Sequence, residues 1–129
     1  MPDRKAIMII GLEPTLLDFS DPTLGVMPGL DAAKVRAGLE RDEASLKALG
    51  HDAELCLTDT GETAAAVVRQ RLLEKPFDHV VIGAGIRTLP RFFLLFEKLI
   101  NVVHEHAPKA RICFNTRPDD TAAAVSRWL

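Results

Sequence analysis

Four short apolar runs recur along the chain, and longer amphipathic segments separate them. The runs cover residues 5–11, 53–58, 78–83 and 110–115. The first and third, KAIMIIG and DHVVIG, are apolar at almost every position, which is typical of strands buried on both faces of a sheet. In the fourth, ARICFN, Ile112 and Phe114 face away from Cys113, and this alternation indicates an edge strand.

The segments between the runs carry helical periodicity. Residues 30–50 place one apolar stripe on a helix whose start is signalled by Asp31 and whose end is signalled by Gly50. The stripe consists of Val35, Leu39, Leu46 and Leu49. Residues 59–75 open on Asp59 and Glu62, which are spaced like a capping box. Residues 88–106 place Thr88 at the cap and Pro90 in the first turn, and residues 119–129 form the last helix.

Strand and helix alternate four times, which is the signature of a parallel sheet with right-handed crossovers. The sequence therefore predicts a single α/β domain over residues 1–129, a doubly wound three-layer sandwich with a four-stranded parallel sheet. We expect the flavodoxin-like strand order 2-1-3-4, because it puts the two most apolar strands in the centre. Residues 12–30 are long for a loop between a strand and a helix, and loops of that length are usually functional or mobile.

Bulk composition narrows the class of protein. The 129 residues are 47% hydrophobic and 26% charged with a net charge of −2, so no basic field points to nucleic acid. No apolar run is long enough for a transmembrane helix, and the first apolar run is too short for a signal peptide. We therefore expect a cytoplasmic protein that binds neither membranes nor nucleic acid.

A ligand site is expected beyond the carboxyl ends of the first and third strands, where the strand order reverses. The loops that meet there are residues 11–30 and 83–91, with residues 115–119 alongside. Gly83-Ala84-Gly85 matches only the first half of a dinucleotide-binding fingerprint, since Thr88 stands where the third glycine belongs. The alternative interpretation is that both glycines permit a tight turn with positive φ.

Three arginines near helix starts make an anion site physically reasonable there. Arg87, Arg91 and Arg117 oppose the positive end of the helix dipole unless a phosphate or carboxylate offsets them. Alternatively, they form ion pairs with Glu13, Asp18, Asp21 or Asp119 and fix the loops. The candidate ligand-binding residues are Glu13, Thr15, Asp18, Gly83, Gly85, Arg87, Thr88, Arg91, Asn115 and Arg117.

Several familiar chemistries are disfavoured. Glu13 follows the first strand and would be a general base, a ligand acceptor or an ion-pair partner, while Asp18 would also suit a turn.

All four histidines fall at the opposite end of the sheet and are expected on the surface: His51, His79, His104 and His106. Cys56 and Cys113 lie on opposite edge strands, too far apart for a disulfide, and are expected to be buried thiols. We predict no metal site and no cofactor, and the residues do not decide whether the site is catalytic.

Three stretches, GAGIRT, LFEKLINVVHEHAP and CFNTRPDDT, carry a resemblance to small flavodoxin-like or Rossmann-like bacterial proteins with no assigned activity. The resemblance implies a bacterial cytoplasmic origin and adds no mechanism. The alternation also looks like that of receiver domains and flavodoxins. Their functional residues do not carry over, because GAGIR replaces the phospho-acceptor aspartate and GLEPTLLDF is not a flavin-phosphate loop.

The segment 88–106 is too apolar for a helix with only one buried face. One face packs on the sheet, and the rest is either covered by residues 12–30 or forms an interface. We expect a symmetric homodimer interface through Phe92, Phe93, Phe96 and Ile100. Two functions follow from the sequence. The first is a small α/β domain that binds an anionic ligand such as a phosphate, nucleotide or carboxylate. The second is a homodimeric interaction module without catalytic activity.

Overall fold

The apolar runs form one parallel sheet in the computed structural model, which describes residues 4–20, 31–116 and 120–129. The strands are β1 (Ala6–Leu12), β2 (Asp52–Thr58), β3 (His79–Ile82) and β4 (Arg111–Phe114), in the order β2-β1-β3-β4. The predicted order is confirmed. The two most apolar strands, β1 and β3, lie in the centre, where both of their edges are paired.

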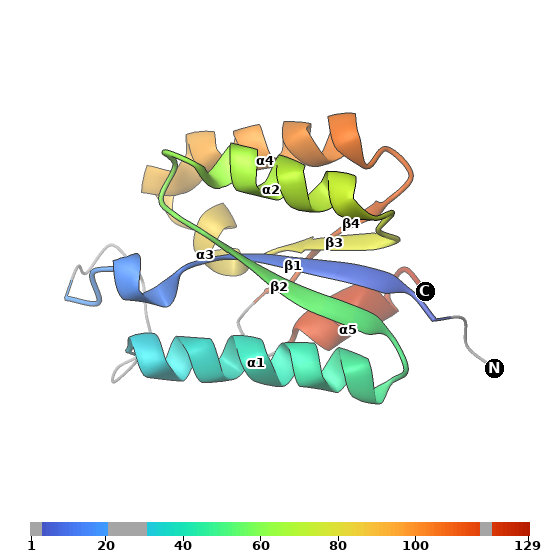
Figure 1. Ribbon diagram of the computed structural model, residues 1–129. Coiled ribbons are helices and arrows are strands. Elements are labelled where there is room, and N and C mark those ends of the chain that lie inside the picture. Colours follow the sequence, from blue (N-terminus) through green and yellow to red (C-terminus); the bar gives the residue numbers. More distant parts are fainter. Residues whose placement is uncertain (1–3, 21–30, 117–119) are drawn as a thin grey trace.

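Helices cover both faces of the sheet, as Figure 1 shows. α2 (Ala64–Glu74) and α4 (Phe93–His106) lie on one face, and α1 (Ala32–Ala48) and α5 (Thr121–Ser126) lie on the other. Because side chains alternate along a strand, Met8 and Ile10 of β1 pack toward α2 and α4, while Ile7 and Ile9 pack toward α1 and α5. The result is the three-layer sandwich that the sequence predicts.

The predicted ends of α1 are confirmed, but its buried stripe differs from the prediction. The Asp31 carboxylate accepts the Lys34 N–H at 2.8 Å, and Gly50 adopts φ +93° just beyond the helix. Leu39 and Leu46 are buried, whereas Leu49 is 53% exposed. Leu49 is the C-cap residue, one position beyond the last helical residue.

The predicted capping box of the second helix is wrong, because α2 begins at Ala64 with Thr63 before it. The Asp59 carboxylate instead accepts the N–H groups of Gly61 and Thr63 in the loop between β2 and α2. These hydrogen bonds, led by the one with the Thr63 hydroxyl, hold the pKa of Asp59 below its usual value. Gly61 has φ +146°, a conformation that side chains other than hydrogen disfavour.

The segment predicted as one helix over 88–106 is three elements. A single turn, α3 (Ala84–Arg87), is followed by a 3-10 turn, η3 (Pro90–Phe92), and then by α4. Thr88 is therefore not an N-cap; its hydroxyl donates to the Ala84 carbonyl at 2.7 Å and closes α3. Pro90 fixes the first position of the 3-10 turn, and this separates α3 from α4.

Candidate functional site

Glu13 lies at the carboxyl end of β1, as predicted, but its carboxylate turns to α1. It accepts from Arg36 at 2.5 Å, from the Thr15 N–H at 3.0 Å and from the Thr15 hydroxyl at 3.1 Å. The hydrogen bond from the Thr15 backbone and the Arg36 guanidinium lower the pKa of Glu13. A carboxylate stabilised in this way is a weak base, so the ion-pair interpretation fits Glu13, with a partner that the sequence did not suggest.

Asp18 occupies a turn. Its carboxylate accepts the Ser20 N–H at 3.0 Å and the Ser20 hydroxyl at 2.5 Å. The following segment, which contains Asp21, lies outside the described residues, as do Arg117 and Asp119.

Arg87 and Asn115 come together at the carboxyl ends of β3 and β4. The Arg87 guanidinium donates to the Asn115 carbonyl and lies 5.5 Å from the centre of the Phe114 ring. In the part of the chain that the structure describes, the buried Nε of Arg87 has no hydrogen-bond partner. Arg87 therefore ties α3 to the end of β4 through a backbone carbonyl.

The side chain of Asn115 belongs to a buried polar chain. Its Oδ1 accepts the Ala84 N–H at 2.8 Å, and its Nδ2 donates to the Thr121 hydroxyl at 3.1 Å. The Thr121 hydroxyl donates in turn to the Asp42 carboxylate at 2.7 Å. Asn115, Thr121 and Asp42 are all buried, so this chain joins the start of α3 to both helices of one layer, α1 and α5. It is a structural tie, and it accounts for the position of Asn115.

Asp42 and Thr121 were missed in the sequence analysis. A signal for Asp42 exists, because it lies three residues after Leu39 and four before Leu46, inside the apolar stripe of α1. A carboxylate within an apolar stripe needs a buried hydrogen-bond partner. Nothing in the sequence indicates that Thr121 supplies it.

The predicted positive φ angles at Gly83 and Gly85 are wrong. Gly83 has φ −66°, and a Cβ atom there would lie 3.2 Å from the Ile10 carbonyl oxygen. That carbonyl accepts the Gly83 N–H at 2.9 Å, so the backbone of Gly83 passes close to β1. Gly85 lies within α3 and a Cβ atom there would meet nothing within 4 Å.

Arg91 lines two adjoining open hollows at the carboxyl ends of the strands. The first, of about 330 Å³, is lined by Leu16, Leu17, Thr60, Arg91 and Phe92. The second, of about 260 Å³, is lined by Thr60, Gly61, Arg91, Leu94, Leu95 and Lys98. The surface combines two cationic side chains with a floor of leucine and phenylalanine. It suits a small molecule that carries an anionic group next to an apolar part.

The predicted ligand residues therefore do not form one cluster. Glu13 and Thr15 are engaged on the α1 side, Arg87 and Asn115 are engaged at β4, and Arg91 faces the loop between β2 and α2. Thr60, Gly61 and Lys98 were missed. The signals for them are the position of Thr60 and Gly61 directly after β2 and the spacing of seven residues, two helical turns, between Arg91 and Lys98.

At the other end of the sheet, the prediction of surface histidines is wrong for His51 and His79, which are both buried. Burial lowers the pKa of His79, so its ring is neutral. The Cys113 Sγ lies 3.8 Å from the His79 Nδ1, and burial raises the pKa of this thiol to about 11. The pair cannot act as a thiolate nucleophile at neutral pH. Cys56 and Cys113 are both buried and unpaired, as predicted.

Among the residues described, no three His, Cys, Asp or Glu side chains are grouped closely enough to hold a metal ion. No helix within residues 4–20, 31–116 and 120–129 has the length and apolar character needed to cross a membrane. Comparison with protein-family models and with curated proteins found no match to this chain.

Proposed function

We propose that this chain is a small-molecule binding domain whose ligand combines an anionic group with an apolar part. The observation that carries the proposal is the pair of hollows around Arg91, which place Arg91 and Lys98 beside exposed leucines where the strands end. The ends of parallel strands are where open α/β sheets generally bind ligands. An anionic ligand is still proposed, as in the sequence analysis, but Arg91 and Lys98 are now proposed to bind it in place of Arg87.

Support for an amphiphilic ligand comes from the exposed apolar side chains around these cations. Leu16 is 52% exposed and Leu94 is 73% exposed, and they line the first and the second hollow respectively. A ligand that covers both removes apolar surface from water, which favours binding by about 25 cal/mol per Å² of apolar area before the costs of association. A bare inorganic anion gains nothing from this surface.

A thermal-shift series tests the proposal with four probes: inorganic phosphate, a nucleoside monophosphate, a sugar phosphate and a medium-chain fatty acid. A probe at one hundred times its Kd stabilises the fold by about 2.7 kcal/mol, which is several degrees in Tm for a domain of this size. We expect the largest shift from the fatty acid and the smallest from phosphate. The shift should vanish in Arg91→Met and shrink in Lys98→Met.

Arg41→Met is the matched control, because Arg41 is an exposed arginine on α1, in the opposite layer. It should leave the shift unchanged. Arg87→Ala should lower the Tm without altering any ligand shift, since Arg87 is engaged with β4. The proposal fails if no probe shifts the Tm, or if the shift survives Arg91→Met.

The homodimer expected through residues 88–106 stays a prediction, but fewer of the predicted side chains are exposed and able to form its interface. Phe92 is only 6% exposed and belongs to the core, so it cannot be an interface residue in this fold. Phe93 is 59% exposed, and Phe96 and Ile100 are partly buried.

A further inference from the structure

The two edge strands of the sheet differ in what happens to their outward-facing backbone groups. In β2, the Asp52 N–H donates to the Lys5 carbonyl and the Thr58 carbonyl accepts the Glu13 N–H, so the backbone N–H and carbonyl groups of the even-numbered residues point toward β1. Those of the odd-numbered residues, including Leu55, point outward from the sheet edge, away from β1. The Glu43 carboxylate accepts the Leu55 N–H at 3.1 Å, and Arg71 donates to the Leu55 carbonyl at 3.1 Å.

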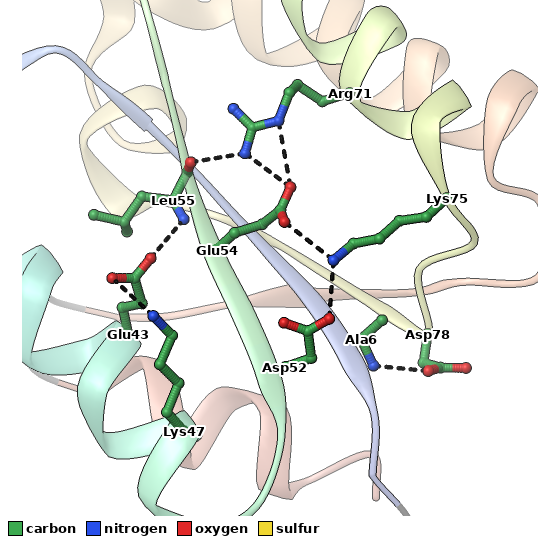
Figure 2. Close-up of polar contacts among 9 residues, drawn as sticks. All are labelled: Ala6, Glu43, Lys47, Asp52, Glu54, Leu55, Arg71, Lys75 and Asp78. Atoms are coloured by element: carbon green, nitrogen blue, oxygen red, sulfur yellow. Dashed lines mark hydrogen bonds and ion pairs between the residues drawn. The ribbon is translucent and has the colours of Figure 1, made fainter.

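We call the two side chains bonded to Leu55 the β2 clamp. Figure 2 shows that they come from helices on opposite faces of the sheet, Glu43 from α1 and Arg71 from α2. Further charges fix the clamp in place. Arg71 also bonds Glu54 at 2.8 Å, and Lys75 bridges Glu54 at 3.1 Å and Asp52 at 2.9 Å. The clamp residues occupy the outward backbone groups of Leu55 in the middle of β2, and a charged cover of this kind disfavours pairing with another strand.

In β4, the backbone N–H and carbonyl groups that point away from β3 belong to Ile112 and Phe114. The Arg111 N–H bonds to the Asp78 carbonyl, so the odd-numbered residues of β4 face β3. The Phe114 carbonyl accepts from Arg127 at 2.7 Å. Within the described ranges, the outward N–H and carbonyl of Ile112 have no partner. This edge is therefore held at one end and open in the middle.

Exposed apolar side chains flank the open edge on both faces of the sheet. On the α4 side, the Phe114 ring is 36% exposed and stacks edge-on against Phe96 at 5.8 Å, with Phe93 one turn away on the same helix. On the α5 side, Trp128 is 51% exposed, and its ring lies 6.0 Å from the guanidinium of Arg111. An unpaired strand edge with exposed apolar side chains on both faces of the sheet is suited to pair with another strand.

We propose that the occupant of this edge is a second copy of the chain, with the two β4 strands antiparallel about a two-fold axis. Two-fold symmetry makes identical strands antiparallel. Because Ile112 and Phe114 are the outward residues, Ile112 exchanges hydrogen bonds with the partner's Phe114, and Cys113 lies on the axis. The two four-stranded sheets become one eight-stranded sheet.

Side chains on both faces favour this register. On the α4 side, Ile112 packs beside the partner's Phe114, with Phe93 and Phe96 around them. On the α5 side, Arg111 lies opposite the partner's Asn115, one residue from Thr116. The Asp120 carboxylate accepts the Thr116 N–H at 2.9 Å and therefore lies close to the partner residue that Arg111 would face, an arrangement of complementary charge. Arg127 must release the Phe114 carbonyl, and its side chain is exposed to solvent.

Sedimentation velocity from low to high micromolar concentration tests the proposal on the full chain. The wild type should form a dimer as concentration rises. Phe93→Lys and Arg111→Glu should each weaken the dimer by at least about tenfold in Kd, as expected for interface groups of this kind. Arg127→Ala should tighten it, because the Phe114 carbonyl becomes available. Leu49→Lys, a change of equal chemistry at a 53% exposed leucine on α1, is the matched control and should leave the dimer intact.

A wild type that stays monomeric at high micromolar concentration would overturn the proposal. So would a dimer that survives both Phe93→Lys and Arg111→Glu, or one that Arg127→Ala weakens. Circular dichroism and thermal unfolding of each variant show whether it is folded, and Phe93 is exposed enough for a lysine to be tolerated. These outcomes do not depend on the ligand site, because the hollows around Arg91 and Lys98 face the loop between β2 and α2.

Discussion

The two edges of the sheet are finished in different ways. β2 has seven residues and is covered by a network of bonded charges, in which Glu43 and Arg71 occupy both outward groups of Leu55. β4 has four residues and aromatic side chains beside it, and among its outward backbone groups only the Phe114 carbonyl has a partner within the described part of the chain, namely Arg127. The difference indicates that charged side chains protect the middle of β2 from pairing with another strand, whereas the middle of β4 is available for it.

The edges also differ in how their strands are attached to the rest of the molecule. β2 is held from outside by partly exposed ion pairs, which contribute little stability each. β4 is held from inside, at its carboxyl end, by the buried chain from Asn115 to Thr121 and Asp42. Loss of the internal tie should therefore cost more than loss of the external clamp.

The largest effect is expected from Asn115→Ala. The change leaves the partly buried Ala84 N–H without an acceptor and removes the hydrogen bond that the Thr121 hydroxyl accepts, so the free energy of unfolding should fall by about 2–3 kcal/mol. Urea unfolding followed by circular dichroism measures the loss. Asn101→Ala is the control, since Asn101 is exposed and donates only to Glu97 on its own helix. Equal losses in the two variants would show that the Asn115 chain adds no special stability.

A smaller effect is expected at the other edge. Arg71→Leu removes the hydrogen bonds to Glu54 and to the Leu55 carbonyl, and it should lower the free energy of unfolding by about 1 kcal/mol after solvent screening. It should also increase aggregation, because an outward carbonyl of β2 is released. Arg69→Leu, an exposed position on the same helix, controls for the added apolar surface. If Arg69→Leu aggregates as readily, the clamp does not protect the edge.

The smallest expected effect is a pH dependence of stability from the ion pairs that support the β2 clamp. Burial raises the pKa of Glu54, but the hydrogen bonds from Arg71 and Lys75 outweigh it, so its pKa lies below the usual value. The hydrogen bond from Lys75 lowers the pKa of Asp52 as well. Since both values are lower in the folded state, their stabilising effect is complete above the unfolded pKa and is lost as the pH falls through the folded pKa.

Stability should therefore decline in mild acid, between about pH 5 and pH 3, and the decline should be shallower in Lys75→Met. Chemical unfolding across that range measures it. Lys109→Met, at an exposed lysine in the loop before β4, should keep the wild-type slope. Identical slopes in all three proteins would contradict the assignment of the acid loss to this clamp.

The strand order could be predicted because it follows from composition: β1 and β3 are apolar on both faces and belong in the centre. The start of α4 could not, because Thr88 and Pro90 are as compatible with a helix start as with the short turns that precede it here. Local patterns place elements well and their boundaries less well.

The candidate site depended on partners far apart in the chain. Glu13 bonds Arg36, Arg87 bonds Asn115, and Glu43 and Arg71 meet at Leu55, and each pair requires the register of strands and helices before it can be foreseen. The loop between β2 and α2 was left out because the site was expected only where β1 and β3 end. The hollows extend sideways from that point to Thr60 and Gly61.

Amide hydrogen exchange of Leu55 and Ile112, measured by NMR in a dilute and a concentrated sample, tests the asymmetry most directly. Both N–H groups point away from the sheet, so the comparison isolates what covers them. We predict that the Leu55 amide is protected in both samples, and that the Ile112 amide exchanges rapidly when dilute and slowly when concentrated. Equal protection of the two amides, unchanged by concentration, would contradict both the clamp on β2 and the open edge of β4.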